Sequence, residues 1–468
     1  MDKAKFAIVG LGVMGQNLAL NIANKGFPVA VYNRTAAVTR KFMEELAGDK
    51  AVMGTYSYSE LATSMETPRR IMLMVKAGPA VDAVIADIKP HLEPGDILID
   101  GGNSFFEDTE RRTTELENEG LLFIGTGVSG GEEGALHGPS IMPGGSREAW
   151  SALETIFTAA AAKAYDGEAC VDYIGPGGAG HYVKMVHNGI EYGIMQMIAE
   201  VYDLLSRGLG MRAEALGDLF AEWNDGELAS YLIEITSEIF RKRDSETGGP
   251  VLDVILDEAQ QKGTGKWTSQ NAFDLGVPTH TINAAVASRI ISGMKSQRLA
   301  ASGLIDGPAP VFSGDRDEMV SAIKEALFAS IVLVYAQGFE LMRVASDEYQ
   351  YDLDLKMIAK IWRAGCIIRA DLLDDIMQAY DRDQSLTNLL FDGHFREAVV
   401  RRQGALRYVL TTAIQMGIPV YALSSALAYF DAYRTERLPA NLTQAQRDYF
   451  GAHTYRRLDK EGTFHTDW

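Results

Sequence analysis

Cysteine is scarce in this chain: Cys170 and Cys366 are the only two cysteines among 468 residues. Two thiols cannot build a disulfide framework or a cysteine-rich metal site, and their scarcity fits a reducing compartment. The histidines complete no metal-ligand spacing and the HExxH pattern is absent, so we expect no bound metal. The first residues show no apolar signal segment, which predicts a cytoplasmic protein.

Positive charge and long apolar runs are also lacking. Asp and Glu total 63 against 44 Lys and Arg, a net charge of −19. An acidic chain is poorly suited to nucleic acid or an anionic membrane surface, so we expect neither as a partner. The nearest long apolar run, residues 326–339, is interrupted by Ser330 and Gln337, which is typical of a core helix.

What is present begins with a strand, a glycine-rich turn and a helix. Apolar residues 6–9 precede the turn, and a second strand is expected at residues 29–32. In this context GxGxxG predicts a dinucleotide-binding turn, because glycine lets the backbone approach a pyrophosphate at a helix N-terminus. The alternative is a purely structural turn. The turn residues that we expect to contact the coenzyme are Gly10, Leu11, Gly12, Val13, Met14 and Gly15.

The second strand ends at Asn33, Arg34 and Thr35. An NAD site usually carries an acidic residue here, which binds the ribose 2′-hydroxyl. A guanidinium followed by a hydroxyl suits a 2′-phosphate instead. These residues therefore predict NADP as the cofactor, although an ordinary solvated loop arginine is the alternative.

Three further apolar strands are expected at residues 70–75, 96–100 and 122–125, and each leads into a glycine-rich polar segment. The carboxyl ends of parallel strands meet at one edge of the sheet, where ligands bind. Together with the glycine-rich turn after the first strand, these make four such segments, which favours a binding site over chance. The residues at or just beyond these strand ends that we assign to the site are Val75, Lys76, Ala77, Asn103, Ser129, Gly130 and Gly131.

Lys184, His187, Asn188 and Glu191 have the spacing of one helical arc. The rest of that helix is apolar nearly all round, which predicts a buried helix whose polar arc faces a substrate cleft. On periodicity alone, the solvent-facing stripe of a surface helix explains the pattern equally well.

Together these motifs resemble the 6-phosphogluconate dehydrogenase family, within the wider β-hydroxyacid dehydrogenase group. The resemblance covers essentially the whole chain. Its later motifs are Lys262, Thr264, Trp267, Arg289, Arg447 and His453.

The resemblance implies an α/β Rossmann-like NADP-binding domain at 1–178, a large all-α domain at 179–436 and a tail at 437–468. Helical periodicity agrees with this after residue 180, most clearly in the runs 183–205, 228–240, 320–342 and 405–433. The tail is polar and aromatic, so it cannot bury a core alone. A frayed terminus is one reading; the resemblance implies that the tail completes the active site of a partner in a homodimer.

The implied reaction is the NADP-dependent oxidative decarboxylation of 6-phosphogluconate to ribulose 5-phosphate, a step of the pentose phosphate pathway and of gluconate utilization. We expect Lys184 to act as base and Glu191 as acid. Asn103 is expected to serve both coenzyme and substrate. The residues expected to bind the substrate are Asn103, Ser129, Gly130, Gly131, His187, Asn188, Tyr192, Lys262, Thr264, Arg289, Arg447 and His453.

Two other functions fit parts of the sequence. A non-decarboxylating β-hydroxyacid dehydrogenase would share Lys184 and Asn188, but Glu191 and the long tail argue against it. A catalytically dead NADP-binding protein would be favoured by loss of Lys184 or Glu191, and both are present. The loop around Lys262 is not a Walker motif, because Gln260 and Trp267 occupy positions that need Gly and Ser or Thr.

Overall fold

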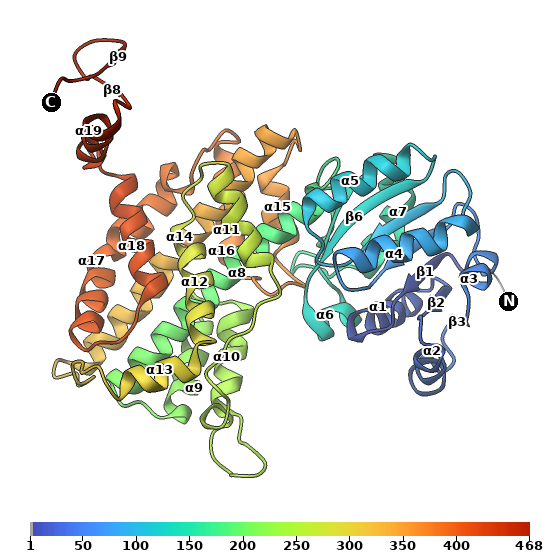
Figure 1. The fold of residues 1–468 in the computed structure, drawn as a ribbon. Helices are drawn as coiled ribbons and strands as arrows, with labels where there is room; N and C mark the ends of the chain where they lie inside the picture. The colour runs from blue at the N-terminus through green and yellow to red at the C-terminus, as the bar shows by residue number, and fades with distance from the viewer. Residues whose placement is uncertain (1–2) are drawn as a thin grey trace.

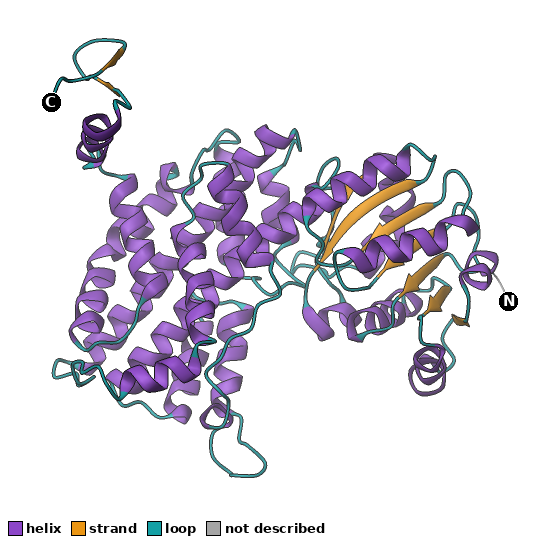
Figure 2. Ribbon diagram, viewed as in Figure 1, coloured by secondary structure: helices purple, strands orange, loops and turns teal. Residues whose placement is uncertain are grey.

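The computed structural model describes residues 3–468, as an α/β domain, a helical domain and a projecting C-terminal segment (Figure 1). Figure 2 shows the orange sheet confined to the first part of the chain, apart from two short strands near the C-terminus. The predicted fold class, Rossmann-like and then all-α, is confirmed.

The α/β domain is built on a seven-stranded sheet of order β3-β2-β1-β4-β5-β6-β7, in which only β7 is antiparallel. Its strands are β1 (Phe6–Val9), β2 (Val29–Tyr32), β3 (Val52–Thr55), β4 (Arg70–Leu73), β5 (Ile97–Asp100), β6 (Leu122–Val128) and β7 (Ile141–Gly145). Its helices are α1 (Val13–Asn24), α2 (Ala36–Phe42), α3 (Tyr58–Ser64), α4 (Pro79–Ile88), α5 (Phe106–Glu117), α6 (Gly131–His137) and α7 (Arg147–Ala160).

Helices cover both faces of the sheet, which is why strands such as β1 and β2 are apolar on both sides. Side chains of α1 and α7, among them Leu18 and Leu153, pack on one face. Side chains of α3, α4 and α5, among them Leu61 and Ile85, pack on the other. The predicted strands are present, although β4 ends two residues early and β6 runs three residues longer. Strands β3 and β7 were not predicted, because neither carries a continuous apolar run.

The helical domain is organised around two central helices, α8 (Ala179–Asp203) and α14 (Arg316–Tyr349). Gly193 and Gly338 sit where these helices meet: a Cβ at Gly193 would lie 2.6 Å from Val334, and one at Gly338 would lie 2.5 Å from Ile190. The remaining helices are α9 (Ala213–Asn224), α10 (Tyr231–Arg241), α11 (Thr264–Asp274), α12 (His280–Ser292), α13 (Lys295–Ser302), α15 (Leu355–Ile361), α16 (Leu372–Arg382), α17 (Gly393–Gln415) and α18 (Tyr421–Tyr433). Shorter helical turns are η1 (Met43–Ala47), η2 (Lys89–His91), η3 (Leu204–Gly208), η4 (Val251–Asp253) and η5 (Leu389–Phe391).

The single helical run predicted for residues 405–433 is wrong, because the chain breaks between α17 and α18. The break lies at Gly417, whose φ of +66° is left-handed and ends a helix without strain. Helix α14 is long and apolar enough to cross a membrane, but 72% of its apolar window is buried inside the protein. It is a core helix.

The segment after α18 carries α19 (Ala440–Gly451) and the short strands β8 (Tyr455–Arg456) and β9 (Thr463–Phe464). Figure 1 shows it standing away from the helical domain, on the side opposite the α/β domain.

Candidate active site

Close packing of glycines fixes helix α8, which carries the polar arc, against the sheet edge. A Cβ on Gly180 would lie 2.4 Å from the carbonyl oxygen of Met142 on β7 and 2.5 Å from that of Gly125 on β6. A Cβ on Gly127 would lie 2.5 Å from the Cβ of Lys184. Real Cβ contacts do not approach so closely, so only glycine allows α8 to reach this depth. The first turns of α8 therefore lie directly beside the carboxyl end of β6.

The helix is buried along this stretch, and its polar arc faces the end of β6. Lys184 is 5% exposed and His187 is 0% exposed, which excludes the surface-stripe interpretation. Lys184 Nζ donates to Ser129 Oγ at 3.0 Å, and Ser129 Oγ lies 3.4 Å from His187 Nε2. Glu191 Oε2 lies 3.9 Å from His187 Nδ1. The structure thus brings together four predicted site residues from two domains.

Hydrogen bonds set the orientation of the imidazole. His187 Nδ1 lies 3.0 Å from Asn188 Oδ1, and Asn188 Nδ2 donates to Thr264 Oγ1 at 3.2 Å. Because the Asn188 oxygen accepts, the ring proton is assigned to Nδ1, which leaves Nε2 to accept from Ser129. Trp362 packs edge-on against the ring with centroids 5.4 Å apart. His187 is therefore held in one orientation.

Burial shifts the acid–base properties of this cluster. It lowers the pKa of Lys184, and the nearby Glu191 offsets only part of that change. Burial raises the pKa of Glu191, against the opposing effects of Lys184 and Arg289. The pKa of His187 lies well below its ordinary value because of burial and then the charge of Lys184. A lysine shifted down and a carboxyl shifted up can serve as base and acid in one reaction.

A second group of predicted residues lies along α8, α11 and α12. The Arg289 guanidinium stacks on the Tyr192 ring 3.4 Å from its centroid, and its Nη1 donates to the Gln260 carbonyl at 3.2 Å. A Cβ on Gly265 would lie 2.5 Å from that same ring. Tyr192, which directly follows Glu191 in α8, and Arg289 are thereby positioned beside the loop that carries Lys262.

Five of the predicted coenzyme residues, Met14, Val75, Lys76, Ala77 and Asn103, line an open cleft of about 710 Å³ at the carboxyl edge of the sheet. The other predicted coenzyme residues, Gly10, Leu11, Gly12, Val13, Gly15, Asn33, Arg34 and Thr35, are not among its lining residues. Lys262 and Trp267 from the helical domain complete its walls. The lining residues are Met14, Met74, Val75, Lys76, Ala77, Gly78, Gly101, Gly102, Asn103, Phe105, Asp108, Val128, Lys262 and Trp267. The cleft is thus shared between the two domains.

The three glycines of the first turn have distinct environments. Gly10 has a φ of +104°, and a Cβ on Gly15 would lie 2.0 Å from the Gly10 carbonyl oxygen. A Cβ on Gly12 would meet nothing within 4 Å. The outer glycines are therefore required by the turn and the helix, whereas Gly12 leaves free space where the pyrophosphate of a dinucleotide approaches.

At the end of β2, Asn33 supports the glycine-rich turn, whereas Arg34 and Thr35 face the solvent. Asn33 Oδ1 accepts from the backbone N–H of Leu11 at 3.1 Å and so braces the glycine-rich turn. Arg34 and Thr35 are exposed. Within residues 3–468, Arg34 makes no hydrogen bond or ion pair, so its guanidinium is available to an anionic group. This donor set fits a 2′-phosphate.

Sequence reasoning missed a buried ionic network that joins two loops of the cleft. Arg112, 1% exposed, donates to Asp100 Oδ2 at 3.3 Å, to the Gly78 carbonyl at 3.1 Å and to both carboxylate oxygens of Asp82. Asp100 also accepts from Ser104 Oγ at 2.6 Å and from the Gly102 N–H at 3.0 Å. The loop after β4 is thereby tied to the loop after β5. A charged residue midway along an amphipathic helix gives no sequence signal of such a role.

Two predicted substrate residues are not brought to this site. Arg447 and His453 lie in the C-terminal segment, which points away from α8 (Figure 1). Arg447 donates to Gln444 at 3.1 Å, and the His453 ring packs on Phe450. Within one chain they cannot reach the cluster around Lys184.

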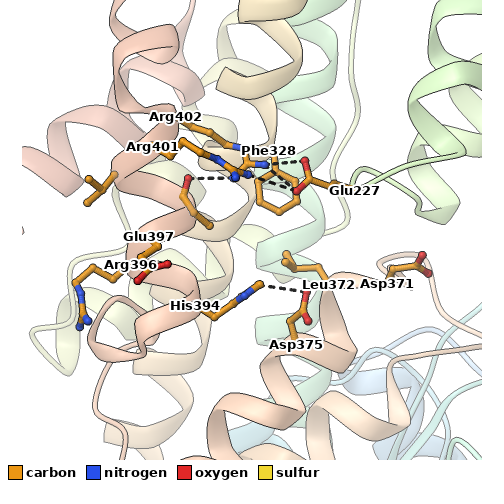
Figure 3. Close-up of a pocket in the computed structure, with 12 residues that line it drawn as sticks. Glu227, Phe328, Asp371, Leu372, Asp375, His394, Arg396, Glu397, Arg401 and Arg402 are labelled. Carbon is orange, nitrogen blue, oxygen red and sulfur yellow. Dashed lines mark hydrogen bonds and ion pairs between the residues drawn. The ribbon is translucent and has the colours of Figure 1, made fainter.

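A separate cavity of about 570 Å³ lies between α14, α16 and α17, drawn in Figure 3. Its buried arginine, Arg402, is paired with Glu227 and Glu325, and His394 lies 3.5 Å from Asp375. Arg402 and His394 thus already have acidic partners, and none of the predicted site residues lines the cavity.

Comparison with known proteins gives matches over the whole chain. Residues 5–175 match the NAD binding domain of 6-phosphogluconate dehydrogenase, and residues 180–468 match the C-terminal domain of 6-phosphogluconate dehydrogenase. An NADP(+)-dependent, decarboxylating 6-phosphogluconate dehydrogenase of Bacillus subtilis is 59% identical, and a decarboxylating one of Escherichia coli is 56% identical, each with 100% of both chains covered. A solved Plasmodium falciparum 6-phosphogluconate dehydrogenase, described in apo form, with NADP+ and with 6-phosphogluconate, superimposes with a TM-score of 0.94 at 43% identity. That match covers 99% of this chain and 100% of the other.

Proposed function

The chain belongs to the 6-phosphogluconate dehydrogenase family, and from that premise we propose which of its residues perform the reaction. The reaction is the oxidative decarboxylation of 6-phosphogluconate to ribulose 5-phosphate and CO2, with NADP as the oxidant. The observation that carries the assignment of roles is the buried contact of Lys184 with Ser129, beside Glu191.

Lys184 is the base of the oxidation step. Burial favours its neutral amine, which can accept the proton of the substrate 3-hydroxyl. Bound NADP supplies the acceptor for the hydride from C3. The ammonium that Lys184 becomes then lies beside the new carbonyl oxygen, where it stabilises the negative charge that develops as the carboxylate leaves as CO2. Because this charge comes from Lys184, the proposed mechanism uses no metal.

Glu191 is the acid of the second half-reaction. Loss of CO2 leaves an enediol whose C1 must be protonated. Burial keeps the Glu191 carboxyl protonated to higher pH than a free carboxyl, so a proton is available one helical turn from His187. We assign His187, Asn188, Asn103 and Ser129, with the Gly130 and Gly131 backbone, to the carboxylate and hydroxyls of the substrate.

The phosphate end is assigned to Tyr192, Lys262, Thr264 and Arg289. Arg289 is fixed by its stack on Tyr192, and Lys262 is exposed on the cleft wall. The local positive charges of Lys262 and Arg289 would explain how a chain of net charge −19 binds a phosphorylated sugar acid. The coenzyme is assigned to the cleft edge from Gly10 to Asn103, with Arg34 on its 2′-phosphate.

We also propose that the protein is a homodimer in the cytoplasm, in which the tail of each chain delivers Arg447 and His453 to the partner's site. We place the domain boundaries at 178/179 and 436/437, so the tail is residues 437–468. A mixing experiment tests the delivery: Lys184→Ala and Arg447→Ala protomers, each weakly active alone, should regain activity when refolded together. No gain, with mixed dimers present, would refute delivery in trans.

The test of the reaction is an assay with NADP, 6-phosphogluconate and a chelator, which follows NADPH absorbance and released CO2 in parallel. We expect equal yields of the two products. NADPH without CO2 would support the non-decarboxylating alternative and remove the role of Glu191. Activity lost on chelation would refute the metal-free mechanism.

A further inference from the structure

The tail has an unusual interior. Within residues 437–468, only Asp448 is buried, with 0% of its surface exposed. Apolar side chains normally fill the interior of a folded unit, yet here Tyr449 and Phe450 are 70% and 73% exposed. A carboxylate therefore occupies the position that a hydrophobic core holds in a larger unit.

The Asp448 carboxylate connects three parts of the tail that are distant in sequence. Its Oδ1 accepts from the Thr454 N–H at 2.9 Å and lies 2.9 Å from His465 Nδ1. Its Oδ2 accepts from the Thr466 N–H and from Trp468 Nε1, each at 3.0 Å. Helix α19, the turn that follows it and the strand β9 region all meet at this one side chain. Both oxygens are fully engaged by donors.

The turn that Asp448 holds is conformationally strained and contains His453. Ala452 has a φ of 49° and Thr454 has a φ of 60°, values that residues with a Cβ rarely adopt and that are least favourable for a β-branched residue. Such strain persists only where the surroundings impose it, and it concentrates at functional positions. The two strained residues flank His453 on either side.

Arg447 is linked to the same turn. Its Nη1 donates to Gln444 Oε1 at 3.1 Å, and Gln444 Nε2 donates to the Thr454 carbonyl at 2.5 Å. Arg447 also neighbours Asp448 in α19. The two residues that we assign to the partner's site are thus both fixed through the contacts of Asp448.

The charge of this carboxylate is stable. Exclusion from solvent raises its pKa, but the Thr466 N–H, His465, Trp468 and the Thr454 N–H together outweigh that effect and hold the pKa at about 2. Asp448 remains ionised throughout the physiological range, and its hydrogen bonds are charge-assisted.

We propose that Asp448 is the positioning residue of the tail: by clamping the turn at 452–454 and the β9 region onto α19, it pre-organises Arg447 and His453 for entry into the partner's active site. This inference rests on the proposed delivery of the tail in trans. Because Asp448 orders the tail within its own chain, less conformational entropy is lost when the dimer forms and the substrate binds.

The experiment compares Asp448→Asn with Asp459→Asn in the full-length protein. Asp459 is an exposed tail carboxylate that bonds Arg457, so its variant is a matched control for lost charge. In Asp448→Asn the amide NH2 faces N–H donors and cannot replace the second oxygen. We expect the KM for 6-phosphogluconate to rise about tenfold, while the KM for NADP, the kcat and the melting temperature stay near wild type. Trp468→Phe, which removes the Nε1 donor and keeps an aromatic side chain, should give a smaller rise in the KM for 6-phosphogluconate.

Combination with the site residues separates positioning from a general structural effect. In an Arg447→Ala, His453→Ala background, Asp448→Asn should cause no further rise in the KM for 6-phosphogluconate, because the residues it positions are absent. A further rise there, or an unchanged KM in the single variant, would overturn the role of Asp448. If Arg447→Ala and His453→Ala alone leave the KM unchanged, the proposed delivery of the tail fails instead.

Discussion

A single methyl group at Gly127 tests whether the depth of α8 in the sheet edge sets the reaction rate. The added Cβ would lie 2.5 Å from Lys184 Cβ, 2.9 Å from Lys184 Cγ and 3.2 Å from the Gly180 carbonyl oxygen. Ordinary contact begins at 3.4 Å, so Lys184 and β6 must separate by about 0.9 Å, the difference between these values. Gly180 is itself packed against β6 and β7, so α8 cannot slide aside without strain.

We expect Gly127→Ala to lower kcat/KM by about 100-fold, because a displacement near 1 Å of a catalytic group costs that much. Overpacking should also lower the free energy of unfolding by about 1–3 kcal/mol. Steady-state kinetics and urea unfolding at fixed protein concentration measure the two effects. Gly404→Ala is the control, because a Cβ there meets nothing within 4 Å and alanine in helix α17 should stabilise by about 0.5–1 kcal/mol. A Gly127→Ala enzyme with kcat/KM within twofold of wild type would refute the argument.

Three further predictions concern single side chains. Lys184→Ala should lower kcat by at least about 10³-fold while NADP titration gives a nearly unchanged Kd; normal turnover would remove Lys184 as the base. Arg34→Glu should raise the KM for NADP about 10- to 100-fold and leave that for 6-phosphogluconate unchanged, and equal NADP kinetics would disprove the 2′-phosphate contact. Glu200 accepts the N–H groups of Ala422 and Leu423 at the start of α18, yet burial raises its pKa to about 7 from 4.5. Between pH 4.5 and 7 the Glu200 carboxyl is therefore protonated in the native state and ionised in the unfolded state. The stabilisation is complete below pH 4.5 and disappears as the pH rises through 7. As the pH is raised from 4.5 to 7, the free energy of unfolding of Glu200→Gln should fall by about 3 kcal/mol less than that of wild type. Equal pH dependence of the two free energies of unfolding would contradict this.

Much of the fold could be predicted because its signals are local. The strands around Ile8 and Ile99 are continuous apolar runs, and the first turn has glycines where a dinucleotide fold needs them. Strand β7 could not be predicted in this way. It is Ile-Met-Pro-Gly-Gly and forms only because it pairs with β6 and supports α8.

The site also has features that local sequence patterns predict and features that depend on tertiary packing. The arc from Lys184 to Glu191 is visible in the sequence because helical spacing converts directly into proximity. The contact of Lys184 with Ser129, 55 residues away in the sequence, is not visible there, because it depends on the glycine packing between β6 and α8. Arg112 and Asp448 were missed for a related reason: a lone charged residue on a helix has no pattern that distinguishes a buried clamp from a solvated side chain.

The exposed end of β2 has a consequence for engineering the enzyme. Arg34 and Thr35 lie on the surface, without the tight glycine packing that surrounds Lys184. If Arg34 binds the 2′-phosphate as we propose, substitutions there should change the choice between the two nicotinamide coenzymes without repacking any core, whereas changes at Gly125, Gly127 or Gly180 disturb the sheet, helix α8 and the packing of Lys184 at once. On this proposal, a library for altered coenzyme use needs to vary only the residues at the end of β2 and can leave the packing around Lys184 unchanged.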